Sequence, residues 1–341
     1  MFNKDSNTTY IIAEMSANHA GSLERAKEII HAAKEAGADC VKIQTYTADT
    51  MTIDCDNKYF QISEGTWEGE NLYQLYKKAY TPWEWQGELK AEAKKIGIDF
   101  LSTPFDKTSV DFLESIGVDS YKVASFELVD LPLIEYIASK NKPIIMSTGM
   151  GTLEEIEEAV QVVKGQGNPN LVLLKCSSAY PAITDDMNLK TMMDMKERFM
   201  VPVGLSDHSL GSLGAVTAVA MGAKVIEKHF CISREIENPD ASFSMEAEEF
   251  KRMVEEIRTV EKAMGKVQYG VSSQEADSKT YRRSIFVVED IKAGERFTEN
   301  NIRIIRPGHG LQPKYYSSVI NKIAKEDILR GTPLLLDMIM E

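Results

Sequence analysis

Two of the five histidines, His208 and His229, end consecutive short apolar runs of the chain. Neutral imidazole is a common ligand for divalent transition metals, and a site with two protein ligands keeps positions open for water and substrate. The spacing is not that of a zinc motif, so two histidines with ordinary structural hydrogen bonds remain the alternative. The pair predicts a candidate metal site with His208 and His229 as its ligands.

Lysines and hydroxyl side chains occupy similar places, within apolar runs or directly after them. They are Lys42, Thr103, Lys122, Ser125, Ser147, Ser178 and Ser206. Ammonium groups supply charge and hydroxyls supply directional donors, which together suit a ligand that carries phosphate and carboxylate. Serines at strand ends also cap helices, and a neighbouring glutamate could neutralise a buried lysine. We expect an anion pocket, with these two structural explanations left open.

The apolar runs that carry these residues are continuously apolar and rich in Val and Ile, as strands buried on both faces are. They span residues 10–13, 40–44, 99–102, 120–124, 143–147, 171–176, 201–205 and 224–229. Helical periodicity fills segments between or after them: residues 22–36, 83–96, 108–116, 131–139, 152–164 and 246–264. Eight strand–helix units predict a (β/α)8 barrel.

A doubly wound open sheet is the competing architecture. A nucleotide-binding version should carry GxGxxG after its first strand, but the chain reads EMSANHAG there. We therefore favour the barrel, whose active site lies at the carboxyl ends of the strands. That rule adds further polar candidates near strand ends: Glu14, Asn18, His19, Gln44, Glu127, Tyr180, Asp207, Glu227 and Lys228.

Two regions depart from the strand–helix alternation. Residues 46–82 show no clear element and are rich in Tyr and Trp, so we interpret them as a loop that covers the substrate. Residues 266–280 are polar and turn-rich, and we expect a linker there. The remainder, residues 281–341, contains short strand-like runs at 284–288, 302–306 and 333–337 and predicts a small β-rich domain. The barrel would then comprise residues 1–265.

Composition excludes several classes of function. The formal net charge is −13, which argues against broad nucleic-acid binding. The four cysteines form no CxxC pair, so we interpret them as free structural thiols. No stretch approaches the ~18 apolar residues that span a bilayer, and no basic-then-apolar leader opens the sequence. We expect a soluble, cytoplasmic protein that binds neither nucleic acid nor membrane.

Ordered motifs along nearly the whole chain resemble the sialic-acid synthase family. They are IIAEMSANHAGSLERAK, VKIQTY, FLSTPFD, YKVAS, PIIMSTGM, CSSAYP, GLSDHSLG, IEKHF and NPDASFS. The C-terminal RPGHGL resembles the antifreeze-protein-like (SAF) domain of the same enzymes. The resemblance implies a transferase reaction, in which C3 of phosphoenolpyruvate attacks the aldehyde of an open-chain amino sugar. Water adds at C2, and phosphate leaves by C–O cleavage.

The resemblance also implies roles for individual residues. His208 and His229 match ligands of a divalent metal ion of the manganese type, with magnesium or cobalt as alternatives, and Glu14 matches a carboxylate near the reacting carbons. Phosphoenolpyruvate contacts are implied for Lys42, Thr103, Lys122, Ser125, Ser147, Ser178 and Ser206. Sugar contacts are implied for Gln44, Glu127, Tyr180, Asp240 and Arg306. Arg306 matches an arginine supplied by a partner subunit, which implies a homodimer with swapped C-terminal domains.

Two positions depart from the family pattern, and the sugar stays open. Ser178 stands where asparagine is frequent, and Asn238 stands where glycine is expected. The opening motif and the stretch EGTWEGENLYQLYKKAYTPWEW resemble members acting on 2,4-diacetamido-2,4,6-trideoxy-L-altrose. Synthases of N-acetylneuraminate and legionaminic acid are the alternatives. A non-catalytic carbohydrate-binding barrel is a more distant one, since it would not need Glu14 with the lysine and histidine pairs.

Overall fold

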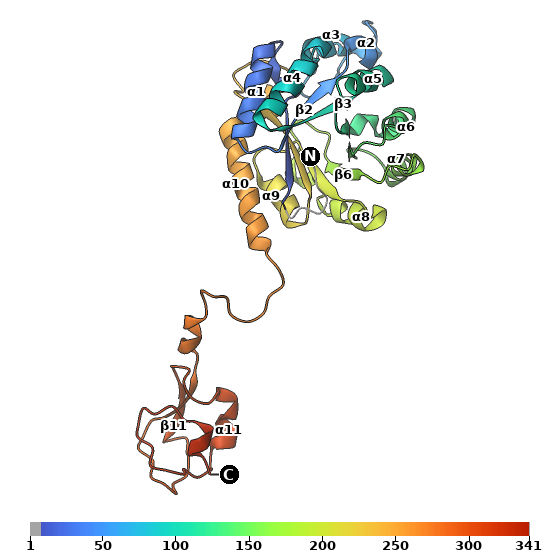
Figure 1. Ribbon diagram of the computed structural model, residues 1–341. Helices are drawn as coiled ribbons and strands as arrows, with labels where there is room; N and C mark the ends of the chain where they lie inside the picture. Colours follow the sequence, from blue (N-terminus) through green and yellow to red (C-terminus); the bar gives the residue numbers. More distant parts are fainter. Residues whose placement is uncertain (1–7, 341) are drawn as a thin grey trace. The chain divides into compact units, whose positions relative to one another are not determined.

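The computed structural model describes residues 8–340, and its first unit is a closed barrel of eight parallel strands surrounded by helices (Figure 1). The strands follow one another in chain order, and β1 pairs with both β2 and β8, which closes the sheet. Their bounds are β1 Tyr10–Glu14, β2 Cys40–Thr45, β3 Asp99–Pro104, β4 Tyr121–Val123, β5 Ile144–Ser147, β6 Leu171–Cys176, β7 Val203–Asp207 and β8 Val225–Cys231. The predicted (β/α)8 barrel is confirmed.

Helices follow every barrel strand. They are α1 Leu23–Glu35, α4 Trp83–Ile96, α5 Lys107–Ser115, α6 Leu131–Ala138, α7 Leu153–Gly165, α8 Lys190–Phe199, α9 Leu213–Ala220 and α10 Ala247–Met264. Local chemistry sets several of their ends. The hydroxyl of Thr152 accepts from the backbone N–H of Glu155, whose carboxylate accepts from the N–H of Thr152, as in a capping box. Gly97, with φ of 73°, ends α4 in the left-handed conformation that glycine adopts without steric cost.

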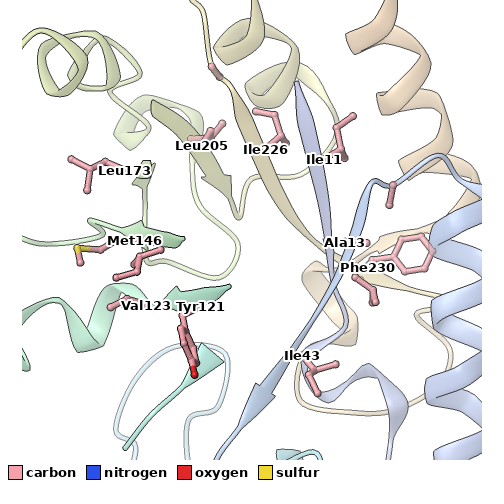
Figure 2. Close-up of a cluster of buried hydrophobic side chains, with 14 of the residues drawn as sticks. Ile11, Ala13, Ile43, Tyr121, Val123, Met146, Leu173, Leu205, Ile226 and Phe230 are labelled. Atoms are coloured by element: carbon pink, nitrogen blue, oxygen red, sulfur yellow. The ribbon is translucent and has the colours of Figure 1, made fainter. Parts of the chain in front are cut away.

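Alternation along the strands divides the buried residues into two sets. Ile11, Ala13 and Ile43 belong to the large cluster between strands and helices, part of which Figure 2 shows. Ile12 and Cys40 belong to a separate small cluster whose members come from β1, β2, β3, β5, β6 and β8. Because side chains alternate between faces with a period of two, this second cluster fills the barrel interior.

The same alternation brings charged residues into the interior above that apolar layer. Lys42 follows Cys40 by two residues, and Glu14 follows Ile12 by two. Both therefore share the inward face of their strands, one layer closer to the carboxyl end. Asp207 and Lys228 have the opposite parity to Ser206 and His229. They form a buried ion pair of their own, with Lys228 Nζ 2.8 Å from Asp207 Oδ2.

The stretch 46–82 contains more regular structure than the sequence predicted. It holds α2 (Ala48–Met51), a 3-10 turn (Lys58–Phe60) and α3 (Leu72–Ala79). The side chain of Asn71 caps α3 by accepting from two backbone N–H groups. The expectation of no clear element was wrong here, because α2 and α3 are only one or two turns long and leave too few residues for a period to be recognised.

The second unit comprises Lys266–Glu341, and the first Met1–Gly265; residues 1–7 and 341 lie outside the described part. β10 (Ser284–Val287) pairs antiparallel with β11 (Ile302–Ile305) over its own apolar core, which includes Phe297. The strand predicted at 333–337 was wrong. Pro333 makes only an isolated bridge to Phe286, and Leu336–Met338 is a 3-10 turn.

Among residues 8–340, no helix is long and apolar enough to cross a bilayer. All four cysteines are free, as predicted.

Candidate active site

Four charged side chains meet inside the barrel at its carboxyl end. Lys42 Nζ lies 2.7 Å from Glu14 Oε2 and 3.5 Å from Glu227 Oε1, and Lys122 Nζ lies 3.4 Å from the same Glu227 oxygen. All four side chains are buried. The two lysines are therefore neutralised by glutamates, the structural explanation that the sequence left open. Their burial alone is no argument for a phosphate.

Burial and mutual attraction set opposite pKa shifts within this group. Burial raises the pKa of Glu14, although Lys42 opposes the shift. Burial lowers the pKa of Lys122 against the attraction of Glu227. For Lys42 and Glu227, burial is outweighed by the opposite charges, so the pKa of Lys42 is raised and that of Glu227 lowered.

Hydroxyl groups adjoin this charged group. Thr103 Oγ1 accepts a 3.4 Å bond from Lys42, and Ser206 donates a 3.3 Å bond to Glu227. Ser147 Oγ is buried without a hydrogen-bond partner. A buried hydroxyl that bonds to nothing in the protein is costly and is ordinarily satisfied by water or by a ligand.

A second hydroxyl pair lies against Gly149. Ser125 Oγ and Ser178 Oγ are 2.8 Å apart. A Cβ added at Gly149, where φ is 44°, would lie 2.3 Å from Ser125 Cβ and 2.7 Å from Ser178 Oγ. The glycine thus lets the loop after β5 approach the loops after β4 and β6, and it holds the two serines close together.

His208 and His229 face the same region, with ring centroids 5.4 Å apart. His208 Nδ1 lies 3.0 Å from the carbonyl oxygen of Ser177, so Nδ1 carries a proton, and in the neutral ring the lone pair is on Nε2. Burial lowers the pKa of His208, but the contacts with Cys176 and with the Ser177 carbonyl outweigh burial and raise it. Burial and the neighbouring His208 lower the pKa of His229 well below its usual value, which keeps it neutral. His229 Nδ1 is buried without a partner.

These features fit a metal ion held by two ring nitrogens. No group of three or more His, Cys, Asp and Glu suited to a metal occurs within the described residues. An ion at the pair would therefore take its remaining ligands from water or substrate.

The loop after β1 links the charged group to the next part of the site. Ser16 has a left-handed φ of 43°, a strained conformation for a residue other than glycine. Its hydroxyl accepts a 2.9 Å bond from Gln44 Nε2, which also donates to Glu14 Oε1 at 3.0 Å. Asp240 Oδ2 accepts from the N–H of Ala17 at 3.1 Å. Of the predicted sugar contacts, Gln44 therefore bonds to Glu14 directly, and Asp240 is linked to Glu14 through Ala17, Ser16 and Gln44.

Tyr180 packs against both histidines, tilted against His208 and edge-on to His229. Glu127 lies on the 3-10 turn Ser125–Val129. The Tyr180 ring centroid is 4.2 Å from that of His208 and 6.0 Å from that of His229. Burial raises the pKa of Glu127 to about 7, and its Oε2 has no hydrogen-bond partner. Arg306 lies in the second unit and is exposed there.

The sequence assigned no role to four residues that border the site. Glu227 was recognised only as a strand-end group, although it bridges both lysines. Cys176 was taken as structural, yet its Sγ lies 3.8 Å from His208 Nδ1 and 3.6 Å from Ser178 Oγ. Trp67 and Phe243 join Tyr180 in one aromatic contact group. A signal in the sequence could have identified Glu227 and Cys176. Glu227 lies two residues before His229, and Cys176 two residues after Leu174, so each shares the inward face of its strand.

Burying charged groups this close together costs stability. Their position, at the carboxyl end of a (β/α)8 barrel, is that of an active site. The molecule therefore has the construction of a barrel enzyme. The chain belongs to the NeuB family, whose model matches residues 29–269, and an SAF domain matches residues 282–340.

Individual relatives are similar in sequence to this chain over nearly its full length. A pseudaminic acid synthase from Campylobacter jejuni is 46% identical over 98% of this chain and 97% of its own. An N,N'-diacetyllegionaminic acid synthase from Legionella pneumophila is 40% identical over 97% of this chain and 95% of its own. The solved structure of an N-acetylneuraminic acid synthetase from Leptospira borgpetersenii aligns with a TM-score of 0.72 and 31% identity, covering 82% of this chain and 94% of that one.

Proposed function

We propose that this chain is a pseudaminic acid synthase. It condenses phosphoenolpyruvate with 2,4-diacetamido-2,4,6-trideoxy-L-altrose and water to give pseudaminic acid and phosphate. The observation that carries the proposal is the 46% identity to a pseudaminic acid synthase over nearly the whole of both chains. In the reaction, C3 of phosphoenolpyruvate bonds to the aldehyde carbon, water supplies the oxygen at C2, and the C2–O bond to phosphate breaks.

The lysine pair and the hydroxyls would hold phosphoenolpyruvate. Lys42, Lys122 and the unpartnered Ser147 hydroxyl supply charge and donors. Thr103, Ser125, Ser178 and Ser206 complete the set of proposed contacts. Because the glutamates already neutralise the lysines, an incoming phosphate makes the pocket net negative. Binding is therefore favoured when Glu14, whose pKa burial raises, takes up a proton.

Glu14 is the proposed acid–base residue. Burial raises the pKa of Glu14, which favours proton uptake by this carboxyl, and Gln44 and Lys42 contact its two oxygens. Gln44, Glu127, Tyr180 and Asp240 are the proposed sugar contacts within the barrel. Glu127 could donate as a neutral acid below pH 7, since its pKa is about 7.

His208 and His229 would hold a divalent metal ion, which we propose to be manganese, with magnesium or cobalt as alternatives. The fixed tautomer of His208 and the neutral state of His229 support this role. The ion, when bound, supplies Lewis-acid polarisation of the aldehyde oxygen. Tyr180 and Phe243 pack against the two imidazoles and help to fix their orientation.

We further propose that residues 1–265 form the catalytic barrel, residues 266–280 a linker, and residues 281–341 a domain that a partner chain donates in a homodimer. Arg306 would then contact the sugar in the partner's barrel. Large apolar side chains that lie exposed in the segments following β4 to β7 support a covering partner. They are Phe126, Met150, Ile183, Leu210 and Leu213.

A legionaminic or N-acetylneuraminic acid synthase is the second candidate, favoured by the 40% identity to a diacetyllegionaminic acid synthase. Phosphate release with manganese and phosphoenolpyruvate separates the candidates. The proposal expects turnover with 2,4-diacetamido-2,4,6-trideoxy-L-altrose well above that with 2,4-diacetamido-2,4,6-trideoxy-D-mannose or N-acetylmannosamine. Turnover of only one of the latter two sugars would assign the second candidate instead.

A further inference from the structure

Residues 61–71 form a small hairpin, here named the Trp67 loop, that holds its own shape. Gln61 and Asn71 form an antiparallel bridge. The N–H of Ile62 donates to the carbonyl of Glu70 at 3.0 Å, and the N–H of Gly69 donates to the carbonyl of Ile62 at 2.9 Å. The loop thus presents Trp67 from a defined turn rather than from an irregular connection.

The tip of the Trp67 loop is fastened to two other barrel loops. Trp67 Nε1 donates a 2.8 Å hydrogen bond to the carbonyl of Pro239, next to Asp240. The hydroxyl of Thr66 donates to the carbonyl of Tyr180. Both partners lie beside proposed sugar contacts, so the tip is tied to the sugar side of the site.

Trp67 continues an aromatic wall, defined here as Trp67, Tyr180 and Phe243, that reaches the histidine pair. The Trp67 centroid lies 5.6 Å from that of Tyr180 and 6.2 Å from that of Phe243. Tyr180 in turn lies 4.2 Å from His208, and Phe243 lies 5.0 Å from His229. A sugar whose aldehyde approaches the histidines therefore has this wall within reach of its other carbons.

The polar capacity of Trp67 is already used within the protein. Indole has a single donor and no acceptor, and Pro239 occupies that donor. Phe243 has no polar group. A hydroxyl packed against these two rings would lose its bond to water and gain none, whereas a methyl group would lose nothing.

We propose that Trp67 is a specificity-determining residue that selects a sugar with a methyl group, rather than a hydroxymethyl group, at C6. This inference rests on the proposed function, because it assigns the Trp67 and Phe243 rings of the wall to the 6-deoxy carbon of the amino sugar. Trp67 acts on the sugar alone. It leaves the phosphoenolpyruvate pocket, which lies among Lys42, Lys122 and the strand-end hydroxyls, unchanged.

The test compares 2,4-diacetamido-2,4,6-trideoxy-L-altrose with its 6-hydroxy counterpart, which differs only at C6. The unmodified enzyme should prefer the 6-deoxy sugar by about 10- to 100-fold in kcat/KM. Trp67→Ala should raise KM for the 6-deoxy sugar and bring the preference close to 1, with KM for phosphoenolpyruvate unchanged. Trp67→Phe should keep most of the preference. Tyr59→Ala, at a side chain 76% exposed in the same connection, is the matched control.

A binding readout complements the kinetics. The chain has three tryptophans, and the other two are engaged elsewhere: Trp83 stacks on Phe112, and Trp85 packs against His19. The sugar should change the tryptophan fluorescence of the unmodified protein, and Trp67→Phe should abolish that change. Circular dichroism and urea unfolding establish that each variant is folded. If Trp67→Ala does not fold, the fluorescence comparison with Trp67→Phe still tests whether the sugar contacts Trp67.

An unchanged preference in Trp67→Ala would overturn the inference. If kcat/KM also fell by the same factor for both sugars, Trp67 would be a general cover of the site rather than a specificity determinant. Failure of the proposed function is separate, because it appears in the unmodified enzyme as turnover of a different amino sugar. The same comparison on the 6-deoxy and 6-hydroxy forms of that sugar would still decide the role of Trp67.

Discussion

Lys122 on β4 and Glu227 on β8 form an ion pair of 3.4 Å across the barrel interior. The two strands lie four positions apart in the closed sheet of eight, so the pair joins opposite sides of the barrel. Neither group reaches bulk water, and each is the other's main compensation for burial. This pair is a structural element of the barrel as well as a part of the site.

Removing one member should cost more than removing both. We expect Glu227→Gln to lower the free energy of unfolding by about 3 kcal/mol, because it leaves the buried Lys122 without its main counter-charge. The double variant Glu227→Gln/Lys122→Met should recover part of that loss. Urea unfolding of both single variants and the double variant measures the coupling. Strictly additive losses would contradict the pairing.

Gly149→Ala should damage the site more than the fold. The added methyl group would meet Ser125 and Ser178, displacing hydroxyls proposed to bind phosphoenolpyruvate. A displacement of about 1 Å is enough for a ~100-fold loss of kcat/KM. Gly211→Ala is the control, since Gly211 also has positive φ (74°) but nothing within 4 Å. It should lose about 1 kcal/mol of stability and keep its activity. Equal kinetic losses in both variants would show that backbone strain alone is responsible.

Substitution of the histidine pair should remove metal binding. His208→Ala and His229→Ala should each weaken manganese binding by at least about 100-fold, because each removes one of only two protein ligands. Calorimetric titration of chelator-treated protein gives the affinity, and phosphate release gives the activity. His31→Ala is the control, since His31 is paired with Glu92 at 2.8 Å on the surface. Unchanged manganese affinity in both site variants would place the ion elsewhere.

The carboxyl of Glu127 should make stability depend on pH. Its pKa of about 7 in the folded protein exceeds the ordinary glutamate value of 4.5, so the folded state holds the proton more tightly than the unfolded chain does. Its contribution is complete below pH 4.5 and is lost as pH rises through 7. The difference in the free energy of unfolding between Glu127→Gln and the unmodified protein should therefore shift in favour of Glu127→Gln between pH 5 and pH 8. The shift should be up to about 3 kcal/mol. Urea midpoints at the two pH values test this, and a difference independent of pH would reject it.

The proposed homodimer with swapped C-terminal domains makes a prediction about mixed subunits. Glu14→Gln disables the barrel, and Arg306→Ala disables the donated arginine, so each variant alone should be nearly inactive. Random reassortment makes about half of the dimers mixed, and each mixed dimer contains one intact site of two. About a quarter of the full activity should return after unfolding and refolding the two variants together. No recovery, with mixed dimers shown by mass spectrometry, would mean that Arg306 acts within its own chain. Full activity of Arg306→Ala alone would mean that Arg306 has no role.

The barrel was predictable because its strands are buried on both faces and read as uninterrupted apolar runs. Lys42 and Lys122 could be placed at the site because they interrupt such runs. The roles of Glu227 and Cys176 could not be read as readily, since only the closed sheet brings β8 opposite β4, and β6 beside the histidines. The rule that active-site residues lie at strand ends also predicted residues that do not face the barrel interior. Asp207 and Lys228 face outward and pair with each other.

Short elements and long-range contacts account for the remaining differences. α3 has only eight residues, too few for a reliable helical period, and its start is set by the side chain of Asn71. The contacts of Trp67 with Tyr180 and Pro239 join residues more than one hundred positions apart. A pattern in the local sequence carries no information about such a contact.

The Trp67 loop makes its cross-strand hydrogen bonds internally, and its tip bonds to Pro239 and Tyr180. Its base bonds to residues 55–56, and Asn71 caps α3. An exchange of residues 61–71 between related enzymes that keeps Asn71 would therefore leave every barrel strand, the charged group and the histidine pair in place. Replacement of the Trp67 loop alone could therefore change the range of sugar substrates within this family. The residues proposed to carry out the condensation would stay the same. Such an enzyme can acquire a new sugar without rebuilding its catalytic machinery.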